Sequence, residues 1–301
     1  MKTLLIAGAS GFIGKRLAKL FLSQGDHVIG LGTSETHPFS VEFPEFEWIR
    51  SDTTVKGDWQ RHVPTADMIL NLTGRNIFRP WTKKYKQAIY DSRILTTRNI
   101  VDAIDGTKPQ RLLTTSAAGI YGDCKEDVLT ETRQPGMGFL ADVCTDWEKE
   151  GVMAQKKGVS VAVMRLGVVL GNGGALSLMI PAFKLFAGGP VGDGSQWFPW
   201  IHLEDLSGCV KFIMENDALE GVFNFTGPTQ VRQKDFARAL GRVLHRPAFF
   251  PAPSFIVKTV MGELGTALLQ SQRVIPDHLL SSGYSFLFPD VDSALDDIFG
   301  N

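Results

Sequence analysis

The chain has few cysteines, almost no net charge and no long apolar run. Its 301 residues include only Cys124, Cys144 and Cys209, an odd number without metal-ligand spacing, so we expect neither a disulfide framework nor a metal site. Lys and Arg number 31 against 32 Asp and Glu, so no positive field favours nucleic acid or anionic lipid. No apolar stretch reaches the about 20 residues of a membrane helix. We therefore expect a soluble, cytoplasmic protein without a nucleic-acid or membrane partner.

Short apolar runs alternate with amphipathic stretches through the first half of the chain. This alternation predicts an α/β fold of the Rossmann type, a doubly wound parallel sheet with helices on both faces. The expected strands are residues 4–7, 28–31, 46–49, 68–72, 111–115, 159–166 and 223–226. The expected helices are residues 13–23, 83–104, 139–156 and 234–244.

Glycine and proline become frequent after residue 170, which indicates a change in organisation. We predict a dinucleotide-binding domain over residues 1–170, to which residues 200–227 return. A smaller mixed domain on the substrate side would then comprise residues 171–199 and 228–301.

The string Gly8-Ala9-Ser10-Gly11-Phe12-Ile13-Gly14 lies between the first strand and the first helix. Glycines let the backbone turn tightly and approach a pyrophosphate, and a helix N-terminus offers free N–H groups and a positive dipole end. In this context the string predicts a dinucleotide site. A tight turn without a ligand is the alternative. The expected contacts are Gly8, Ser10, Gly11, Phe12, Ile13 and Gly14.

The end of the second strand indicates which dinucleotide is bound. An acid there would hold the ribose 2′-hydroxyl of NAD, but Thr33 and Ser34 precede the first acid, Glu35. Both hydroxyls could donate to a 2′-phosphate, and Lys15 and Arg16 follow the glycine turn. We therefore expect NADP(H), although no arginine stands at that strand end. Solvated helix-start charge is the other interpretation of the two basic residues.

Further motifs follow in a specific order. They are Asn71-Leu72-Thr73-Gly74, Trp81-Thr82, Ser92-Arg93 with Thr97, Thr115–Gly122, Arg165–Gly171, Gly188-Gly189-Pro190, Trp200–Asp205 and Gln272-Arg273-Val274. With the glycine turn they resemble the extended short-chain dehydrogenases/reductases. More narrowly, the chain resembles the nucleoside-diphosphate-sugar-epimerase-like "epimerase family" that carries a C-terminal domain of unknown function.

The resemblance implies an NADP-binding fold with a substrate cleft under a C-terminal lid. It implies an oxidoreductase or epimerase-like activity on a small carbonyl or hydroxyl compound, without naming the reaction. It also admits a homodimer, because extended relatives often pair through helices. The further cofactor contacts we expect are Asp52, Leu72, Thr73, Gly74 and Arg165.

The catalytic residues of the resembled enzymes are incomplete here. Those enzymes use Ser, Tyr and a Lys four residues after the Tyr, which lowers the tyrosine pKa. The aligned Tyr and Lys positions hold Phe139 and Val143, and the Ser position falls at Ser116 or Ala117. Our candidates for the proton donor are Ser116 and Tyr121. The alternative is a catalytically silent NADP(H)-binding sensor.

Tyr121 and Lys125 match a Tyr-x-x-x-Lys pattern, but Gly122-Asp123 between them is typical of a turn. The two side chains would therefore not share a helical face. Packing of the Tyr121 ring beneath the cofactor is the structural alternative.

An aromatic-rich segment, residues 195–202, follows a glycine loop and is expected to wall a substrate pocket. The alternative for its tryptophans is core at a domain interface, and for its histidine a hydrogen-bonded structural role. Arg93 and Arg165 could meet an anionic substrate or cofactor phosphates, or form structural ion pairs. The substrate-side candidates are Trp81, Arg93, Gln196, Trp200 and His202.

Overall fold

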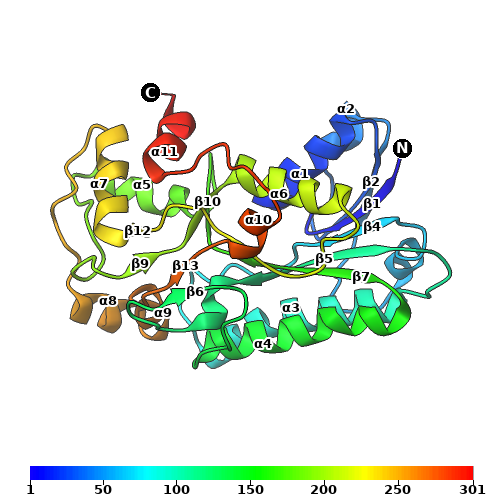
Figure 1. The fold of residues 1–301 in the computed structure, drawn as a ribbon, viewed down its shortest axis with the longest axis horizontal. Helices are drawn as coiled ribbons and strands as arrows, with labels where there is room; N and C mark the ends of the chain where they lie inside the picture. The colour runs from blue at the N-terminus through cyan, green and yellow to red at the C-terminus, as the bar shows by residue number, and fades with distance from the viewer. Residues whose placement is uncertain (301) are drawn as a thin grey trace.

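A seven-stranded parallel sheet forms the centre of the molecule in the computed structural model, which describes residues 1–300 (Figure 1). Its strand order is β11-β7-β5-β4-β1-β2-β3. The strands are β1 (Thr3–Ala7), β2 (His27–Gly32), β3 (Phe46–Arg50), β4 (Met68–Asn71), β5 (Arg111–Ala117), β7 (Ser160–Leu166) and β11 (Gly221–Phe225). Apolar runs such as Leu4–Ala7 are fully buried, as a parallel sheet covered on both faces requires.

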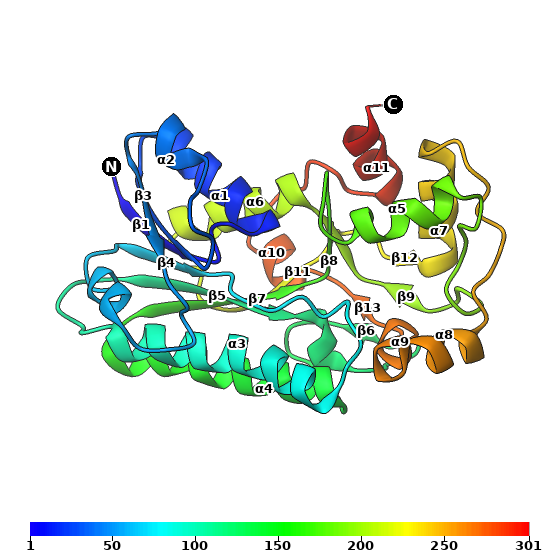
Figure 2. The same ribbon diagram turned by 180° about the vertical axis from the view of Figure 1, so that it is seen from behind.

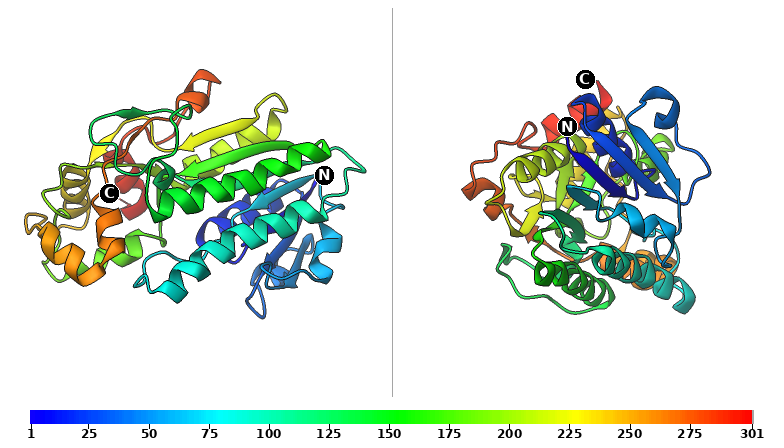
Figure 3. Two further views of the ribbon diagram at one scale, coloured as in Figure 1. Left: turned by 90° about the horizontal axis from the view of Figure 1, so that it is seen from below. Right: turned by 90° about the vertical axis from the view of Figure 1, so that its right-hand side faces the viewer.

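Helices cover both faces of this sheet. On one face lie α1 (Phe12–Ser23) and α6 (Leu203–Glu215), and on the other lie α3 (Lys83–Ala103) and α4 (Phe139–Val152) (Figures 1 and 2). The view from below shows α3 and α4 side by side (Figure 3). The doubly wound Rossmann-type fold expected from the sequence is confirmed. The helix expected to reach residue 156 ends at Val152, and a 3-10 turn, η3 (Met153–Lys157), follows it.

The smaller lobe consists of helices and three strand pairs at one end of the molecule (Figure 1). Its helices are α5 (Leu176–Lys184), α7 (Gln233–Val243), α8 (Ser254–Met261), α9 (Glu263–Leu268) and α11 (Val291–Phe299). The paired strands are β8 (Val168–Leu170) with β10 (Trp200–His202), β9 (Trp197–Phe198) with β12 (Val231–Arg232), and β6 (Val128–Leu129) with β13 (Arg273–Val274). The short elements α2 (Phe39–Glu42), η1 (Asp58–His62) and η2 (Ala118–Tyr121) lie in the larger domain.

One part of the C-terminal segment returns to the sheet domain. In α10 (Asp277–Ser281), the His278 ring stacks on Phe223 of β11 with 4.0 Å between ring centroids. The Tyr284 hydroxyl donates to the Asp205 carbonyl of α6 at 3.1 Å. Residues 277–284 therefore pack on the larger domain, whereas the sequence placed them in the smaller one.

Residues 1–300, the part that the structure describes, lack both a membrane-spanning helix and a metal-binding cluster. No helix is both long and apolar enough to cross a membrane. No group of three or more His, Cys, Asp or Glu side chains is arranged to hold a metal ion.

Candidate functional site

The glycine turn lies where β1 ends, at the carboxyl edge of the sheet, where open α/β folds bind ligands. Gly8 has φ +86°, a left-handed conformation that favours glycine. A Cβ at Gly14 would lie 2.2 Å from the Gly8 carbonyl oxygen and 2.7 Å from the Ala9 Cα. Any side chain at Gly14 would therefore push α1 away from the strand.

The first turn of α1 presents backbone N–H groups without a capping side chain. Its N-cap, Gly11, makes no side-chain hydrogen bond, and no acid lies in the first turn. The Lys15 amide is bonded to the Gly11 carbonyl at 2.9 Å, so the amides before it face an anion site with the positive end of the helix dipole.

The loop after β4 adds an unsatisfied hydroxyl to this edge. A Cβ at Gly8 would lie 3.3 Å from the Thr73 amide nitrogen, so the two segments are close. The Thr73 Oγ1 is buried without a hydrogen-bond partner among the described residues. Buried polar atoms are normally paired, so this orphaned hydroxyl and the uncapped helix fit a dinucleotide pyrophosphate.

Two residues with exposed hydroxyls follow β2, and an arginine ends the neighbouring strand β3. Thr33 and Ser34 are exposed just after β2. Arg50 pairs in register with Gly32, and its Nη1 lies 3.4 Å from the Glu35 carboxylate. The sequence analysis found no arginine at the end of the second strand, but the neighbouring strand supplies one. This group has the donors that a 2′-phosphate needs.

The other charged residues near the turn differ in whether their side chains are free to contact a cofactor. Lys15 and Asp52 are exposed. The Asp52 Oδ1 accepts the Thr54 amide proton at 3.0 Å. Arg16 is engaged with Glu204 of α6, with 2.6 Å between Nε and Oε1. Arg16 therefore joins α1 to α6 and is not free for a phosphate.

The remaining side chains of the turn pack against neighbouring segments. The Ser10 hydroxyl lies beside Gly32, 3.0 Å from where a Cβ there would stand. The Phe12 ring lies against a loop of small residues, with 2.9 Å to a Cβ placed on Gly171 or Gly174. Ile13 and Leu72 are half-buried and pack on the core between the sheet and α1.

Arg93 of α3 lies beneath the loop that follows β4. Its Nη1 donates to the carbonyls of Arg75 at 3.2 Å and Ile89 at 3.1 Å. The guanidinium lies over the Trp147 ring at 5.2 Å and against Gly74. Burial lowers the pKa of Arg93, and no carboxylate within residues 1–300 forms an ion pair with it. This cation supports the Gly74 loop from inside.

A buried polar network holds both candidate catalytic hydroxyls. The Ser116 hydroxyl donates to Glu148 Oε1 at 2.6 Å. Arg165 forms a two-fold ion pair with Glu148, at 2.8 and 2.9 Å, and its Nη1 donates to the Tyr121 hydroxyl at 3.0 Å. The Tyr121 hydroxyl in turn donates to Asn224 Oδ1 at 2.6 Å.

This network occupies the groups that the sequence offered for chemistry. Ser116 and Tyr121 are each 1% exposed and Arg165 is 5% exposed, and burial raises the pKa of the Tyr121 phenol. The Arg165 guanidinium faces Glu148 and Tyr121 rather than the glycine turn. The hydrogen bonds of Ser116, Tyr121 and Arg165 are those of the structural alternative, and their catalytic and cofactor roles stay predictions.

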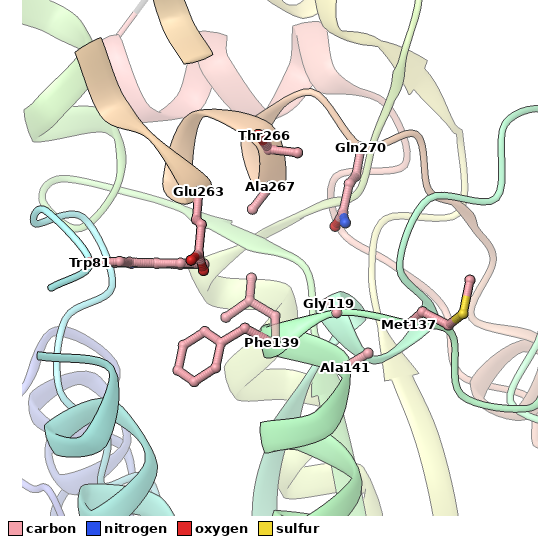
Figure 4. A pocket seen from close by; sticks show the side chains of 11 residues that line it. Trp81, Gly119, Met137, Phe139, Ala141, Glu263, Thr266, Ala267 and Gln270 are labelled. Atoms are coloured by element: carbon pink, nitrogen blue, oxygen red, sulfur yellow. The ribbon is translucent and has the colours of Figure 1, made fainter. Parts of the chain in front are cut away.

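A pocket of about 210 Å³ lies at the N-terminus of α4 (Figure 4). Its walls come from the segment before α3, the end of β5, the start of α4, and α9 of the C-terminal lobe. The lining residues are Trp81, Gly119, Met137, Gly138, Phe139, Leu140, Ala141, Glu263, Thr266, Ala267 and Gln270. Phe139, which the sequence aligns with the usual tyrosine, meets Trp81 edge to face with 5.1 Å between ring centroids.

An ion pair between the two lobes lies at this pocket. Lys86 Nζ is 2.6 Å from the Glu263 Oε2, and it also lies 4.6 Å from the centroid of the Phe139 ring. Lys86 belongs to α3 and Glu263 begins α9, so the pair connects the dinucleotide-binding domain to the C-terminal lobe.

Three of the five substrate-side candidates lie elsewhere. Gln196 is buried and donates to the Val191 carbonyl. Trp200 is 1% exposed in the core of the smaller lobe. His202 is 2% exposed, and its Nδ1 accepts the Glu204 amide proton at the start of α6. These side chains support the structural alternatives, and Trp81 alone among the five lines the pocket of Figure 4.

The family follows from comparison with known proteins. The model of the NAD dependent epimerase/dehydratase family matches residues 4–225, and that of a domain of unknown function, DUF1731, matches residues 252–298. The chain belongs to the epimerase family. Its relatives include the chloroplastic SDR39U1 homolog of Arabidopsis thaliana, 37% identical over 97% of this chain and 85% of the relative. The epimerase family protein YfhF of Bacillus subtilis is 34% identical over 98% and 97% of the two chains.

Solved structures agree with this assignment. The human epimerase family protein SDR39U1, solved with NADPH, matches with a TM-score of 0.86, 30% identity and 99% coverage of both chains. The UDP-glucuronic acid 4-epimerase of Bacillus cereus, solved with UDP-glucuronic acid and NAD, has a TM-score of 0.79 over 99% of this chain and 98% of that one. At 18% identity that second likeness concerns the fold alone.

The epimerase-family motifs did not reveal the polar side of the pocket. Glu263, Thr266 and Gln270 come from the DUF1731 region, whose sequence carries no motif that places it opposite Trp81. Their spacing on one helical face was the available signal. It would have indicated a polar helix face without showing what that face meets.

Proposed function

We propose that this epimerase-family chain binds NADP(H) along the carboxyl edge of its sheet. The observation that carries this proposal is the combination of an uncapped α1 N-terminus with the orphaned Thr73 hydroxyl. Both features lack a protein partner, and both suit pyrophosphate oxygens. The residues that would hold the 2′-phosphate are Lys15, Thr33, Ser34 and Arg50.

The reaction we propose is an oxidoreductase or epimerase-like conversion of a small carbonyl or hydroxyl compound in the pocket of Figure 4. NADPH supplies a hydride when it is bound. The Trp81 and Phe139 rings form an apolar wall of the pocket, and the Lys86–Glu263 pair provides the charged groups beside it. Phe139 and Val143 have no titratable side-chain group, so the usual Tyr–Lys proton transfer has no counterpart on α4.

An NADPH-consumption assay with a panel of aldehydes and ketones tests this proposal. We expect turnover by the wild-type chain, and a lower kcat/KM with unchanged NADPH affinity in Trp81→Ala, because that ring lines the substrate pocket and lies outside the cofactor cradle. A chain that binds NADPH but consumes none with any compound of the panel contradicts the enzymatic proposal.

A catalytically silent NADP(H) sensor is the second candidate. The burial of the Ser116 and Tyr121 hydroxyls in one network favours it. For this candidate we expect Tyr121→Phe and Ser116→Ala to bind NADPH as the wild type does, with no turnover in any of the three proteins. Turnover by wild type that Tyr121→Phe abolishes, at unchanged NADPH affinity, would restore a catalytic role for Tyr121.

Two proposals concern the whole protein. A cytoplasmic location follows from the composition, and localisation of a tagged full chain tests it. A homodimer is the assembly that extended relatives suggest. Light scattering distinguishes it from a monomer of 33.1 kDa.

A further inference from the structure

The walls of the pocket at the α4 N-terminus are mainly aromatic and aliphatic. Trp81 and Phe139 meet edge to face, and Met137 and Leu140 continue the apolar surface. The Trp81 indole N–H already donates to the Ile77 carbonyl at 2.9 Å. The indole therefore offers a ligand an apolar surface and no donor. Such walls suit a flat, unsaturated ligand.

The polar side chains of the pocket come from α9 and from Gln270, two residues beyond its end. Glu263 and Thr266 are three residues apart, which places them on one helical face, and Figure 4 shows all three above the α4 N-terminus. No group within residues 1–300 hydrogen-bonds to the Thr266 hydroxyl or to the Gln270 side-chain amide. Two neutral groups that donate and accept are therefore free to bind a ligand.

The charge of the pocket is balanced within the protein. Glu263 is the one charged residue that lines it, and Lys86 neutralises its carboxylate at 2.6 Å. The lining residues therefore offer a charged ligand no free counter-ion. The arrangement therefore favours an uncharged ligand over a carboxylate or a phosphate.

The pocket itself is small. Its volume of about 210 Å³ suits a one-ring ligand, and an adjoining hollow of about 360 Å³ shares Trp81, Phe139 and Glu263 with it. A nucleoside-diphosphate sugar carries two phosphates, and no residue that lines the pocket offers them a free cation.

We propose that the pocket binds a small, uncharged, flat carbonyl compound, an aromatic or conjugated ketone or aldehyde. The ring of the ligand lies against Trp81 and Phe139, and its carbonyl oxygen accepts a hydrogen bond from the Gln270 amide or the Thr266 hydroxyl. This assignment rests on the proposed function and adds a substrate class to it. It also gives the DUF1731 region the task of selecting the substrate.

Ligand-observed NMR titrations of the full chain, with and without NADP⁺, test the assignment. Acetophenone and benzoate are matched in size and differ in charge, and UDP-glucose represents the sugar nucleotides. We expect acetophenone to bind about tenfold more tightly than benzoate, because the benzoate charge would be desolvated without a partner. We expect UDP-glucose not to compete with it. Equal or tighter binding of benzoate, or displacement by UDP-glucose, would overturn the assignment.

Variants locate the binding site. Thr266→Val keeps the side-chain shape and Gln270→Leu shortens the side chain, and both remove hydrogen-bonding groups. At least one should weaken acetophenone binding roughly fivefold, the effect of one lost hydrogen bond. Gln24→Leu is the control, since Gln24 is an exposed glutamine beyond α1. Affinities in both pocket variants equal to that of Gln24→Leu would refute the polar contacts.

NADPH titration of the same samples separates the two proposals. A chain that binds NADPH but neither acetophenone nor related flat ketones disproves the substrate class and leaves the cofactor site intact. A chain that binds the ketone but not NADPH disproves the cofactor proposal instead.

Discussion

Glu148 is the centre of the buried network that holds Ser116, Tyr121 and Arg165, so Glu148→Gln tests whether this network stabilises the fold. Glutamine keeps the shape of the side chain but removes its charge. The Arg165 and Glu148 side chains are only 6% and 13% exposed, so the variant leaves a buried guanidinium without its counter-ion. Breaking such a pair from one side costs about 3–5 kcal/mol.

Urea unfolding followed by circular dichroism measures this loss. With a denaturant slope of about 3 kcal/mol per molar, the midpoint should fall by roughly 1 M or more. Glu263→Gln is the matched control, because its partner pair is 60% and 29% exposed and should contribute about 0–1 kcal/mol. A Glu148→Gln midpoint within about 0.2 M of wild type, or a larger loss in Glu263→Gln, would refute the structural role of the network.

Three further predictions concern the cofactor cradle and a buried histidine. Gly14→Ala should abolish NADPH binding, because its Cβ would lie 2.2 Å from the Gly8 oxygen. Gly57→Ala is the control and should bind NADPH normally, since its Cβ would lie 3.6 Å from the nearest atom. Equal NADPH affinity of the two variants contradicts the proposed cofactor cradle. Thr73→Val should raise the unfolding free energy of the cofactor-free chain by about 1 kcal/mol, because it removes an unpaired buried hydroxyl. The same variant should bind NADPH more weakly in a fluorescence titration. An unchanged NADPH affinity would place Thr73 outside the cofactor site. Burial lowers the pKa of His202, so its stabilising effect is complete above the unfolded value of about 6.5 and is lost as the pH falls below it, by up to about 1.4 kcal/mol per pH unit. Urea unfolding at pH 7 and pH 5.5 should show this loss of unfolding free energy in wild type and a smaller loss in His202→Asn. Equal losses in the two proteins would exclude His202 as the source.

The sheet and the cofactor turn were predictable because their signals are local. Buried runs such as Leu4–Ala7 and Val161–Met164 have the composition of doubly covered parallel strands. The string from Gly8 to Gly14 needs only its own strand and helix to form the turn. Local composition and spacing therefore sufficed for the fold class and for the geometry of the glycine turn.

The catalytic and substrate candidates depended on long-range contacts that spacing does not reveal. Ser116 is the last residue but one of β5, and its hydroxyl donates to Glu148 of α4. His202 precedes a helix, and its ring caps that helix. A motif gives the position of such a residue along the chain, but packing decides which face of the strand or helix it occupies.

The groups that the sequence analysis missed come from neighbouring segments in space. Arg50 lies beside Thr33 because β3 pairs in register with β2, and a register is set by the whole sheet. Gln270 and Phe139 line one pocket because the C-terminal lobe folds over the α4 N-terminus. Neither contact leaves a trace in the spacing of residues.

Fluorescence titrations of the wild-type chain with NADPH and NADH bear most directly on the cofactor cradle. We predict saturable binding of NADPH, about tenfold or more tighter than NADH, because the 2′-phosphate gains a charge-assisted hydrogen bond from Arg50 or Lys15. Tighter binding of NADH would contradict the 2′-phosphate contacts. Binding of neither would show that the glycine turn is structural and that the cradle holds no dinucleotide.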